Sequence, residues 1–468
     1  MSSGIFLLTV APLLAAFVAW LLGRWARLTA VWGITFSLLL WYFLGRVLLA
    51  VDGREVVAVL GPEVVFTAGV QALFQFLWLV LALLFLFTFI FPTGSTFVAG
   101  CLLVMAPLAL ALMIRPYLFA PIFLLLALGL TAVVIQDGQA GPTKAATRML
   151  ATAVVGIPFF LLAGWLLSAQ AASLAGATSR IILLGSLILL AGFPFHVWAT
   201  SVIRHAPPPV WVFVFGIVQL AVTAFVFQFL AASNSVDDQA ISWLRLSSGV
   251  TFLVAVLLMA TAVQVHRLIA GALLVDMGLL LLTVTLPLDV GWETAVILLV
   301  ARLFTLLLLA LALLLLKKQE VSQLFSFENI PPTIGNDQGV ACRLPFTMAL
   351  LGVGIVSLLG VPLTIGFGSH WLALQMIFAA DLAGVENTSG WLAVMFLLAV
   401  FSGLVAFIRL TIYYLTPSEK SAGTTEREHV WLRIGVGMGL LLATWLAVQP
   451  QIWLGFASDL ARSFLSSG

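Results

Sequence analysis

Four ionisable side chains lie inside long apolar stretches of this sequence, where a charge is costly to bury. They are Asp276, Arg302, His196 and His370. An ionisable group at membrane depth is by default a candidate for moving protons or ions. Histidine titrates near neutral pH and can pass protons. These residue types indicate proton transfer, and the sequence offers no nucleophile–base pair, metal-ligand cluster or nucleotide motif beside them.

Asp276 and Arg302 have the spacing expected of a pair in the middle of a membrane. Asp276 follows Arg267 in an apolar run, and a rise of about 1.5 Å per residue places it about 13 Å into its helix. Arg302 lies about eleven residues into the next run, again near the midplane. The two helices are consecutive and antiparallel, so the side chains can meet. They form either a static ion pair that fixes helix packing or a relay for a proton or ion.

Each of the two histidines follows a proline within an apolar run. Pro194 and Pro362 remove a backbone hydrogen bond and clash with the preceding turn, so each helix must break or kink. In a bilayer such a break is tolerated only where it is buried in protein or lines a wet cavity. His196 and His370 either bond the backbone carbonyls freed by the break or relay protons. Two interrupted segments in corresponding places of two halves indicate a transporter built from repeats.

The composition requires a membrane protein. The chain has 468 residues, of which 63% are hydrophobic and 8% charged, with a mean hydropathy of +1.21. Soluble domains carry roughly 25% charged residues. The net charge of +2 gives no sign of nucleic-acid binding. Residues 4–22 are apolar but are followed, not preceded, by Arg24 and Arg27, so we expect this segment to remain as an anchor.

A helix that crosses the bilayer needs about 20 apolar residues. This criterion predicts about fourteen spans, at 4–23, 28–50, 71–92, 95–114, 117–136, 145–168, 179–200, 209–231, 247–265, 267–287, 291–316, 343–379, 391–416 and 431–449. Lysine and arginine are concentrated in the connections after odd-numbered spans, whereas Arg245 is expected in the connection before residue 247. The positive-inside rule then places both chain termini outside.

Four segments resemble the antiporter-like, proton-conducting subunits of respiratory complex I. The first reads PFHVW at 194–198 with APPPV at 206–210, similar to the PFHxW…GAPxPV signature of that family. The others are HRLIA at 266–270 continuing to Met277-Gly278, GVPLTIGF at 360–367, and 402–409 with Tyr413-Tyr414. The resemblance covers most of the chain from about 70 to 450. Length, span number, outside termini and the lack of a long C-terminal lateral helix resemble the N subunit most.

The resemblance implies an all-α polytopic membrane protein with about fourteen transmembrane helices. It also implies two inverted five-helix repeats, each containing a broken helix. The expected divisions are three N-terminal helices at 1–93, a first repeat at 94–231, a second at 245–417, and a C-terminal helix and tail at 418–468.

The sequence departs from the family pattern in its first half. The family places a lysine seven residues before the motif histidine, where this chain has Leu189. It places a glutamate in the fifth span, where no acid occurs between residues 116 and 136. In the second half, the twelfth-span lysine aligns with His370, and the family's polar positions align with Asp276 and near Arg302. The first half of this chain therefore lacks the charged residues of the family pattern, and the second half carries an unusual set of ionisable residues at those positions.

The resemblance implies a membrane-arm subunit of a complex I-like quinone oxidoreductase that takes part in or supports proton translocation, with a degenerate first half-channel. Asp276 is expected to bind the proton, Arg302 to adjust its proton affinity, and His370 to shuttle the proton outwards, with His196 as a further candidate. Redox centres and quinone chemistry would lie on other chains, so no cofactor is expected on this one.

The expected partners are other membrane and redox subunits, the lipid bilayer, and quinone only through neighbouring subunits, without nucleic acid. The expected location is a bacterial cytoplasmic membrane. Two other functions stay open. One is a non-pumping structural subunit, and the other is a subunit of a cation/proton antiporter of the same superfamily.

Overall fold

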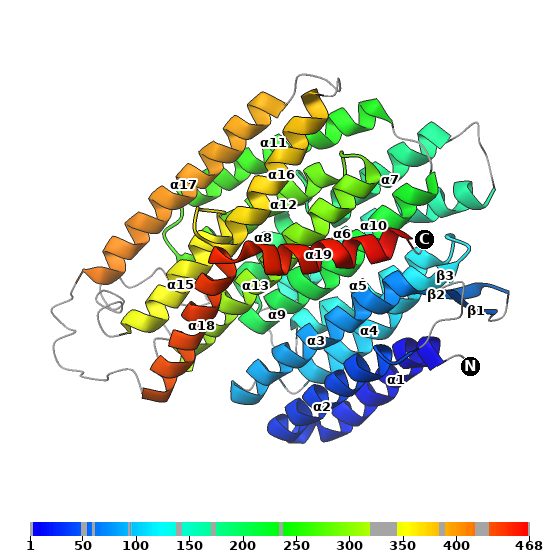
Figure 1. The fold of residues 1–468 in the computed structure, drawn as a ribbon, viewed down its shortest axis with the longest axis horizontal. Helices are drawn as coiled ribbons and strands as arrows, with labels where there is room; N and C mark the ends of the chain where they lie inside the picture. The colour runs from blue at the N-terminus through cyan, green and yellow to red at the C-terminus, as the bar shows by residue number, and fades with distance from the viewer. Residues whose placement is uncertain are drawn as a thin grey trace.

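The helices follow the apolar runs of the sequence. The computed structural model describes the whole chain except residues 1–2, 48–53, 59–60, 92–93, 95, 137–142, 170–174, 234–236, 319–343, 383–388, 417–429 and 467–468. Most helices lie side by side along one direction of the molecule (Figure 1). Leucine, alanine and phenylalanine dominate them, and these apolar side chains are stable in a helix whose surroundings contain no water.

Three helices and a small sheet make up the N-terminal part. The helices are α1 (Ser3–Leu21), α2 (Ala26–Leu44) and α3 (Ala68–Ile90). A short 3₁₀ turn, η1 (Leu22–Arg24), joins the first two. The side chain of Thr67 accepts a hydrogen bond from the backbone N–H of Val70 at 3.3 Å and so caps the start of α3. Helix α2 packs against α3, and α1 packs against α4 (Phe97–Met113).

The sheet is a departure from the all-helical prediction. Strands β1 (Arg54–Ala58), β2 (Glu63–Thr67) and β3 (Ile114–Arg115) pair in the antiparallel order β1-β2-β3. Val56 lies opposite Val65 in this register. Valine-rich runs on both sides of a Gly-Pro pair are typical of a hairpin, because β-branched residues favour strands and glycine favours turns. Gly61 lies in this turn with a φ of +110°.

The helices from residue 97 to 415 fall in two consecutive series. The first holds α4, α5 (Ala120–Gln136), α6 (Thr143–Ser168), α7 (Ala175–Leu189), α8 (Val197–His205), α9 (Pro208–Val212), the π-helix η3 (Phe213–Val218) and α10 (Gln219–Ser233). The second holds α11 (Asp238–Ala260), α12 (Val265–Thr283), α13 (Leu288–Lys318), α15 (Pro345–Leu358), α16 (Ile365–Leu382) and α17 (Ser389–Leu415).

Among the described residues, nine helical segments are long and apolar enough to cross a membrane, or ten if the bent pair α18 (Val430–Val448) and α19 (Pro450–Ser466) counts as one span. Helices α4, α5, α7, α15 and α16 are apolar but shorter. The expected number of fourteen spans and the inverted repeats therefore stay predictions. So do the divisions at 1–93, 94–231, 245–417 and 418–468.

Both predicted helix breaks are present. Helix α7 ends at Leu189 and α8 begins at Val197, so Pro194 lies between them. Helix α15 ends at Leu358 and α16 begins at Ile365, with Pro362 between them. Gly360 has a φ of +71° in the second break, a left-handed conformation that favours glycine.

A neighbouring helix satisfies the backbone at the first break. The N–H of Phe193 donates to Thr251 Oγ1 at 3.0 Å, and Ser247 Oγ donates to the carbonyl of Phe193 at 2.7 Å. Both partners come from α11. The backbone N–H and carbonyl of Phe193 are therefore satisfied by protein side chains, as a bilayer requires of irregular backbone, although the Phe193 side chain itself is exposed.

The centre of the bundle is formed by α10, α12 and α13. In these spans 100%, 89% and 89% of the most apolar window is buried within the chain, against 28% for α17. The outer helices therefore present apolar side chains to lipid or to neighbouring subunits, whereas α12 and α13 are enclosed on all sides. A charge in the buried middle of α12 or α13 must therefore find its partner inside the protein.

The last helix was not expected as an element of its own. Helix α19 turns by 75° from α18 and crosses the other helices, drawn in red in Figure 1. It packs on α13 and α3, and Trp292 Nε1 donates to the carbonyl of Ala461 at 2.9 Å. The sequence prediction placed only a tail after the last span.

Candidate functional site

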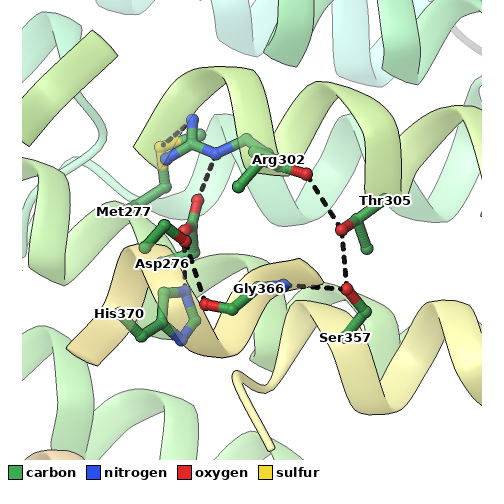
Figure 2. A network of polar contacts seen from close by, with 9 residues as sticks. Asp276, Met277, Arg302, Thr305, Ser357, Gly366 and His370 are labelled. Atoms are coloured by element: carbon green, nitrogen blue, oxygen red, sulfur yellow. Dashed lines mark hydrogen bonds and ion pairs between the residues drawn. The ribbon is translucent and has the colours of Figure 1, made fainter. Parts of the chain in front are cut away.

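Asp276, Arg302 and His370 meet in the interior of the second series of helices (Figure 2). Arg302 Nε donates to Asp276 Oδ2, and His370 Nε2 lies 3.0 Å from Asp276 Oδ1. The three residues are only 2%, 2% and 3% exposed. The contact between Asp276 and Arg302 expected from their spacing is present, and His370 completes a cluster on the same carboxylate.

Three elements position this cluster. Helices α12 and α13 form an antiparallel hairpin, which brings Asp276 beside Arg302. The break before α16 lets that helix start deep in the bundle, so His370 lies in its second turn and close to the hairpin. The guanidinium makes one further contact, from Nη1 to the Sδ of Met277 at 3.5 Å.

The cluster balances its charges. A carboxylate or a guanidinium buried alone would carry a large desolvation penalty, and the direct contact between them offsets it. The imidazole can then be neutral or protonated. Because His370 Nε2 lies within hydrogen-bond distance of the carboxylate, a proton can pass between the two groups without a large movement.

A chain of hydroxyl groups runs beside the ion cluster (Figure 2). Thr305 Oγ1 donates to the carbonyl of Ala301 at 3.0 Å and lies 2.9 Å from Ser357 Oγ. Ser357 Oγ in turn accepts a hydrogen bond from the N–H of Gly366 at 3.1 Å. These bonds tie α13 and α15 to the first turn of α16, and so they fix the helix that carries His370.

Gly360 shapes the other side of the histidine. A Cβ added at this glycine would lie 1.9 Å from His370 Nδ1. The ring also makes an edge contact with Phe396, with centroids 5.9 Å apart. His370 Nδ1 is buried and has no hydrogen-bond partner among the residues that the structure describes. The imidazole is therefore held on one nitrogen by the carboxylate and on its other side by close packing.

His196, the fourth predicted site residue, does not join this cluster. It lies at the start of α8, stacked on Phe193 with ring centroids 5.9 Å apart. Its Nδ1 is buried without a hydrogen-bond partner, so within the described part of the chain it does not bond a carbonyl freed by the break. Leu189, where the family has a lysine, is 6% exposed in an apolar environment.

Arg245 corrects one expectation from the sequence. It does not lie in a connection but inside α11, where it is 3% exposed. The apolar criterion started this span at residue 247, because Asp237, Asp238 and Arg245 lower the apolar content of the first turns. The side chain of Asp237 caps α11 by accepting from the N–H of Ala240 at 3.0 Å, a signal at 237–240 that marks the true helix start.

Other charged residues near the ends of the helices tie elements together. Arg180 of α7 forms an ion pair with Asp237 at 2.5 Å. This hydrogen bond lowers the pKa of the Asp237 carboxyl from its usual value, aided by the Ala240 N–H. Arg409 of α17 donates to the carbonyls of Ala260 and Ala262 at the end of α11. Such cations stabilise the last carbonyls of a helix.

The described residues hold no group of three or more His, Cys, Asp or Glu side chains that could bind a metal ion. The buried cluster has one carboxylate and one imidazole, with an arginine against them. A guanidinium repels a cation, so the donor set suits a proton far better than a metal.

A family model described as NADH:quinone oxidoreductase/Mrp antiporter, TM, matches residues 169–402. This range includes both helix breaks and all members of the buried cluster.

The curated relatives include NADH-quinone oxidoreductase subunit N 2 of Chloroherpeton thalassium, which is 28% identical over 53% of this chain and 48% of the relative. Subunit N of Salinispora arenicola is 26% identical over 60% of this chain and 52% of the relative. The chain thus matches about half the length of these relatives.

Solved structures share the fold over nearly the whole chain. A chain of the membrane-bound sulfane sulfur reductase, an archaeal respiratory membrane complex, has a TM-score of 0.75 at 17% identity, covering 98% of this chain and 97% of its own. A chain of the Mrp complex from Dietzia sp. has a TM-score of 0.74 at 14% identity, covering 99% and 98%. A chain of respiratory complex I from Thermus thermophilus has a TM-score of 0.64 at 19% identity, covering 95% and 98%.

Proposed function

Because the chain belongs to the NADH:quinone oxidoreductase/Mrp antiporter membrane family, we propose that it is a membrane-arm subunit of a complex I-like quinone oxidoreductase, most like subunit N. In this proposal the second half of the chain takes part in proton translocation, and Asp276, Arg302 and His370 are the residues that carry it.

The proposal rests on one observation: the carboxylate of Asp276 contacts both Arg302 and His370. Asp276 contacts a permanent cation through one oxygen and a titratable imidazole through the other, and all three side chains are buried. A packing ion pair needs only the first contact. The second contact adds an imidazole, a group that can both accept and donate a proton.

The chemistry of one proton step follows from the two ring nitrogens of His370. Protonated Asp276 can donate the proton on Oδ1 to His370 Nε2, which turns a neutral ring that carries its hydrogen on Nδ1 into an imidazolium. Once Asp276 is protonated, its attraction to Arg302 falls and the guanidinium is left under-compensated. Transfer of the proton from the carboxyl to the ring is therefore favoured, because it restores the carboxylate beside Arg302.

The first half has no such cluster among its described residues. Leu189 stands where the family has a lysine, and His196 has no charged contact. We therefore propose a degenerate first half-channel. Redox centres and quinone would belong to neighbouring subunits, and the chain would lie in a bacterial cytoplasmic membrane with both termini outside.

One alternative has support in the family itself, which includes Mrp antiporters as well as oxidoreductases. A subunit of a cation/proton antiporter would use the same buried cluster without redox partners. Extraction in mild detergent separates the two. Co-purification with redox subunits and quinone-reductase activity supports the oxidoreductase, and an assembly without either supports the antiporter.

The main test compares two histidines that lie near corresponding helix breaks. His370→Gln keeps a donor near Asp276 but cannot titrate, whereas His196→Gln changes a histidine without a charged partner. In reconstituted assemblies we expect His370→Gln to lower the ratio of protons moved to quinone reduced, and His196→Gln to leave the ratio unchanged.

Two results would contradict the proposal. A normal proton ratio in His370→Gln would assign the cluster to packing and favour a non-pumping structural subunit. An equal loss in His196→Gln would mean that the first half-channel is not degenerate.

A further inference from the structure

A small cavity lies in the first half of the chain, between the two ends of the broken helix and the helices around it. Its volume is about 20 Å³. Leu189, the last residue of α7, and Trp198, the second residue of α8, both line it. Met149 and Thr152 of α6 and Gln219 of α10 contribute to the same wall. The remaining lining side chains are apolar.

Two of these residues carry buried N–H donors without an acceptor. They are Trp198 Nε1 and Gln219 Nε2. Trp198 is 4% exposed and Gln219 is 2% exposed, so bulk water does not satisfy either group. A buried donor left without an acceptor costs about 1–3 kcal/mol. Both residues line the same cavity, so the cavity is the place where one acceptor can reach both side chains.

The backbone before Gln219 places its side chain at this wall. The π-helix η3 ends at Val218, directly before Gln219, and residues 209–227 around it are all buried. A π-helical turn holds an extra residue and rotates the side chains that follow, and it is often found at functional sites. Trp198 is fixed separately, since its ring stacks on Phe215 with centroids 5.6 Å apart.

We infer that Trp198 Nε1 and Gln219 Nε2 bind one water molecule in this cavity. A water oxygen accepts two hydrogen bonds, which matches the two donors. Thr152 Oγ1 donates to the carbonyl of Arg148 at 2.9 Å, so its lone pairs can accept from the water in turn. A buried water needs about 10–15 Å³ and two to four polar partners. The cavity therefore holds one water and is too small for a chain of them.

An anion is the competing ligand for two donors, and the charges exclude it. The residues that line the cavity include no lysine, arginine or histidine. A bare anion buried without a counter-charge carries a far larger penalty than a neutral water. The first half thus contains a neutral hydrated site, and this inference stands independently of the proposed function.

Hydroxyl-radical footprinting tests the water directly, because X-rays generate radicals from bound water that oxidise the side chains beside it. Met149 lines the cavity and is 4% exposed, whereas Met105 and Met113 of α4 are 0% exposed and do not line it. In the purified assembly we expect Met149 to be converted to sulfoxide several-fold faster than Met105 and Met113.

A double variant and a control variant test whether the oxidation of Met149 depends on the N–H groups of Trp198 and Gln219. Gln219→Leu combined with Trp198→Phe should reduce Met149 oxidation to the rate of Met105. Gln228→Leu is the matched control, since Gln228 lies on the same helix but donates to the carbonyl of Leu112 at 3.0 Å, away from the cavity. It should leave the oxidation of Met149 unchanged.

The outcomes are decisive in both directions. Met149 oxidation no faster than that of Met105 in the unmodified chain would overturn the inference, whatever the variants do. Undiminished oxidation in the double variant would also overturn it. If the double variant fails to assemble, Trp198→Phe alone should still lower Met149 oxidation, and no decrease there would contradict the assignment.

Discussion

Asp276 has two partners of different chemistry, and their order of importance can be measured. Arg302 is permanently charged and contacts one carboxylate oxygen, while His370 contacts the other. The arginine must offset the buried carboxylate at every pH, whereas the histidine contributes charge only when protonated. We therefore expect stability to depend mainly on Arg302 and, under the proposed function, proton exchange to depend mainly on His370.

We predict that Arg302→Ala is more damaging than the double change Asp276→Asn with Arg302→Gln. The single change leaves a buried carboxylate unpaired, which typically costs about 3–5 kcal/mol or forces protonation. The double change removes both charges and keeps hydrogen-bonding groups. The yield of assembled complex and redox-driven ion uptake measure the difference. Equal damage from both, or milder damage from the single change, would mean that the two residues are not coupled.

We predict that Gly360→Ala disturbs His370 specifically. The new Cβ would meet Nδ1 at 1.9 Å, and alanine would have to adopt a φ of +71°. The left-handed conformation alone costs about 1–2 kcal/mol for a residue with a side chain. Proton transport should fall more than assembly. Gly435→Ala is the control, because a Cβ there meets nothing within 4 Å, and it should be harmless.

The site was predictable from the sequence to the extent that charge in an apolar run is conspicuous. Asp276 and Arg302 stand out because each is surrounded by leucine, valine or alanine. Trp198 and Gln219 do not stand out, since an indole or an amide in an apolar helix is unremarkable. Only the packing shows that both of their N–H groups are buried without an acceptor.

At the scale of the elements, the broken helices are the best-predicted feature. Proline in an apolar run has a direct steric consequence, so Pro194 and Pro362 located both breaks from the sequence. Helix starts were harder to predict. The first turns of α11 contain Asp238 and Arg245, and an apolar window cannot recognise a helix whose beginning is polar. The strands were not predicted because the search for long apolar runs passed over the short valine-rich runs within 54–67.

The first broken helix supports a prediction at Leu189. This residue is 6% exposed and lines the small cavity, with no acid among the lining residues. Leu189→Lys would therefore bury a cation without a counter-charge. A lysine at a helix centre in a membrane costs about 2.5–3.5 kcal/mol, so we expect lower thermal stability and less assembled complex. Leu189→Met keeps the size without the charge and should behave as the unmodified chain.

A result of equal stability in Leu189→Lys and Leu189→Met would contradict this account. It would mean that the first half supplies a hidden acid or enough water to solvate an ammonium group. The test therefore also probes the proposal that the first half-channel is degenerate.

At the scale of the whole molecule, the outer helices expose apolar side chains that no other part of the described chain covers. Only 28% of the most apolar window of α17 is buried, and Phe401 and Leu397 on this helix are 66% and 61% exposed. Scattered apolar residues are normal on a lipid-facing helix. Related solved structures are chains of multi-subunit complexes.

We predict that the chain expressed alone does not form a monodisperse, ion-transporting protein. Its outer helices and its buried cluster would lack the lateral neighbours that the proposed function requires. Size-exclusion chromatography in mild detergent and proton-flux measurements in liposomes test this. A single monodisperse species with transport activity would contradict the prediction that the chain works only together with other subunits.

Helix α19 crosses α13 near its start and so fixes the position of α13 along its axis. The position of Arg302 beside Asp276 depends on that position. Trp292 and Glu293 near the start of α13 are held by Ala461, Ser458 and Arg462 of α19. Arg302 follows on the same rigid helix about 14 Å further along. Sliding α13 by one residue would move the guanidinium by about 1.5 Å along the axis and turn it to another face. The contacts of α19 therefore hold the start of α13 in place, and we expect changes near residue 460 to shift the guanidinium relative to Asp276.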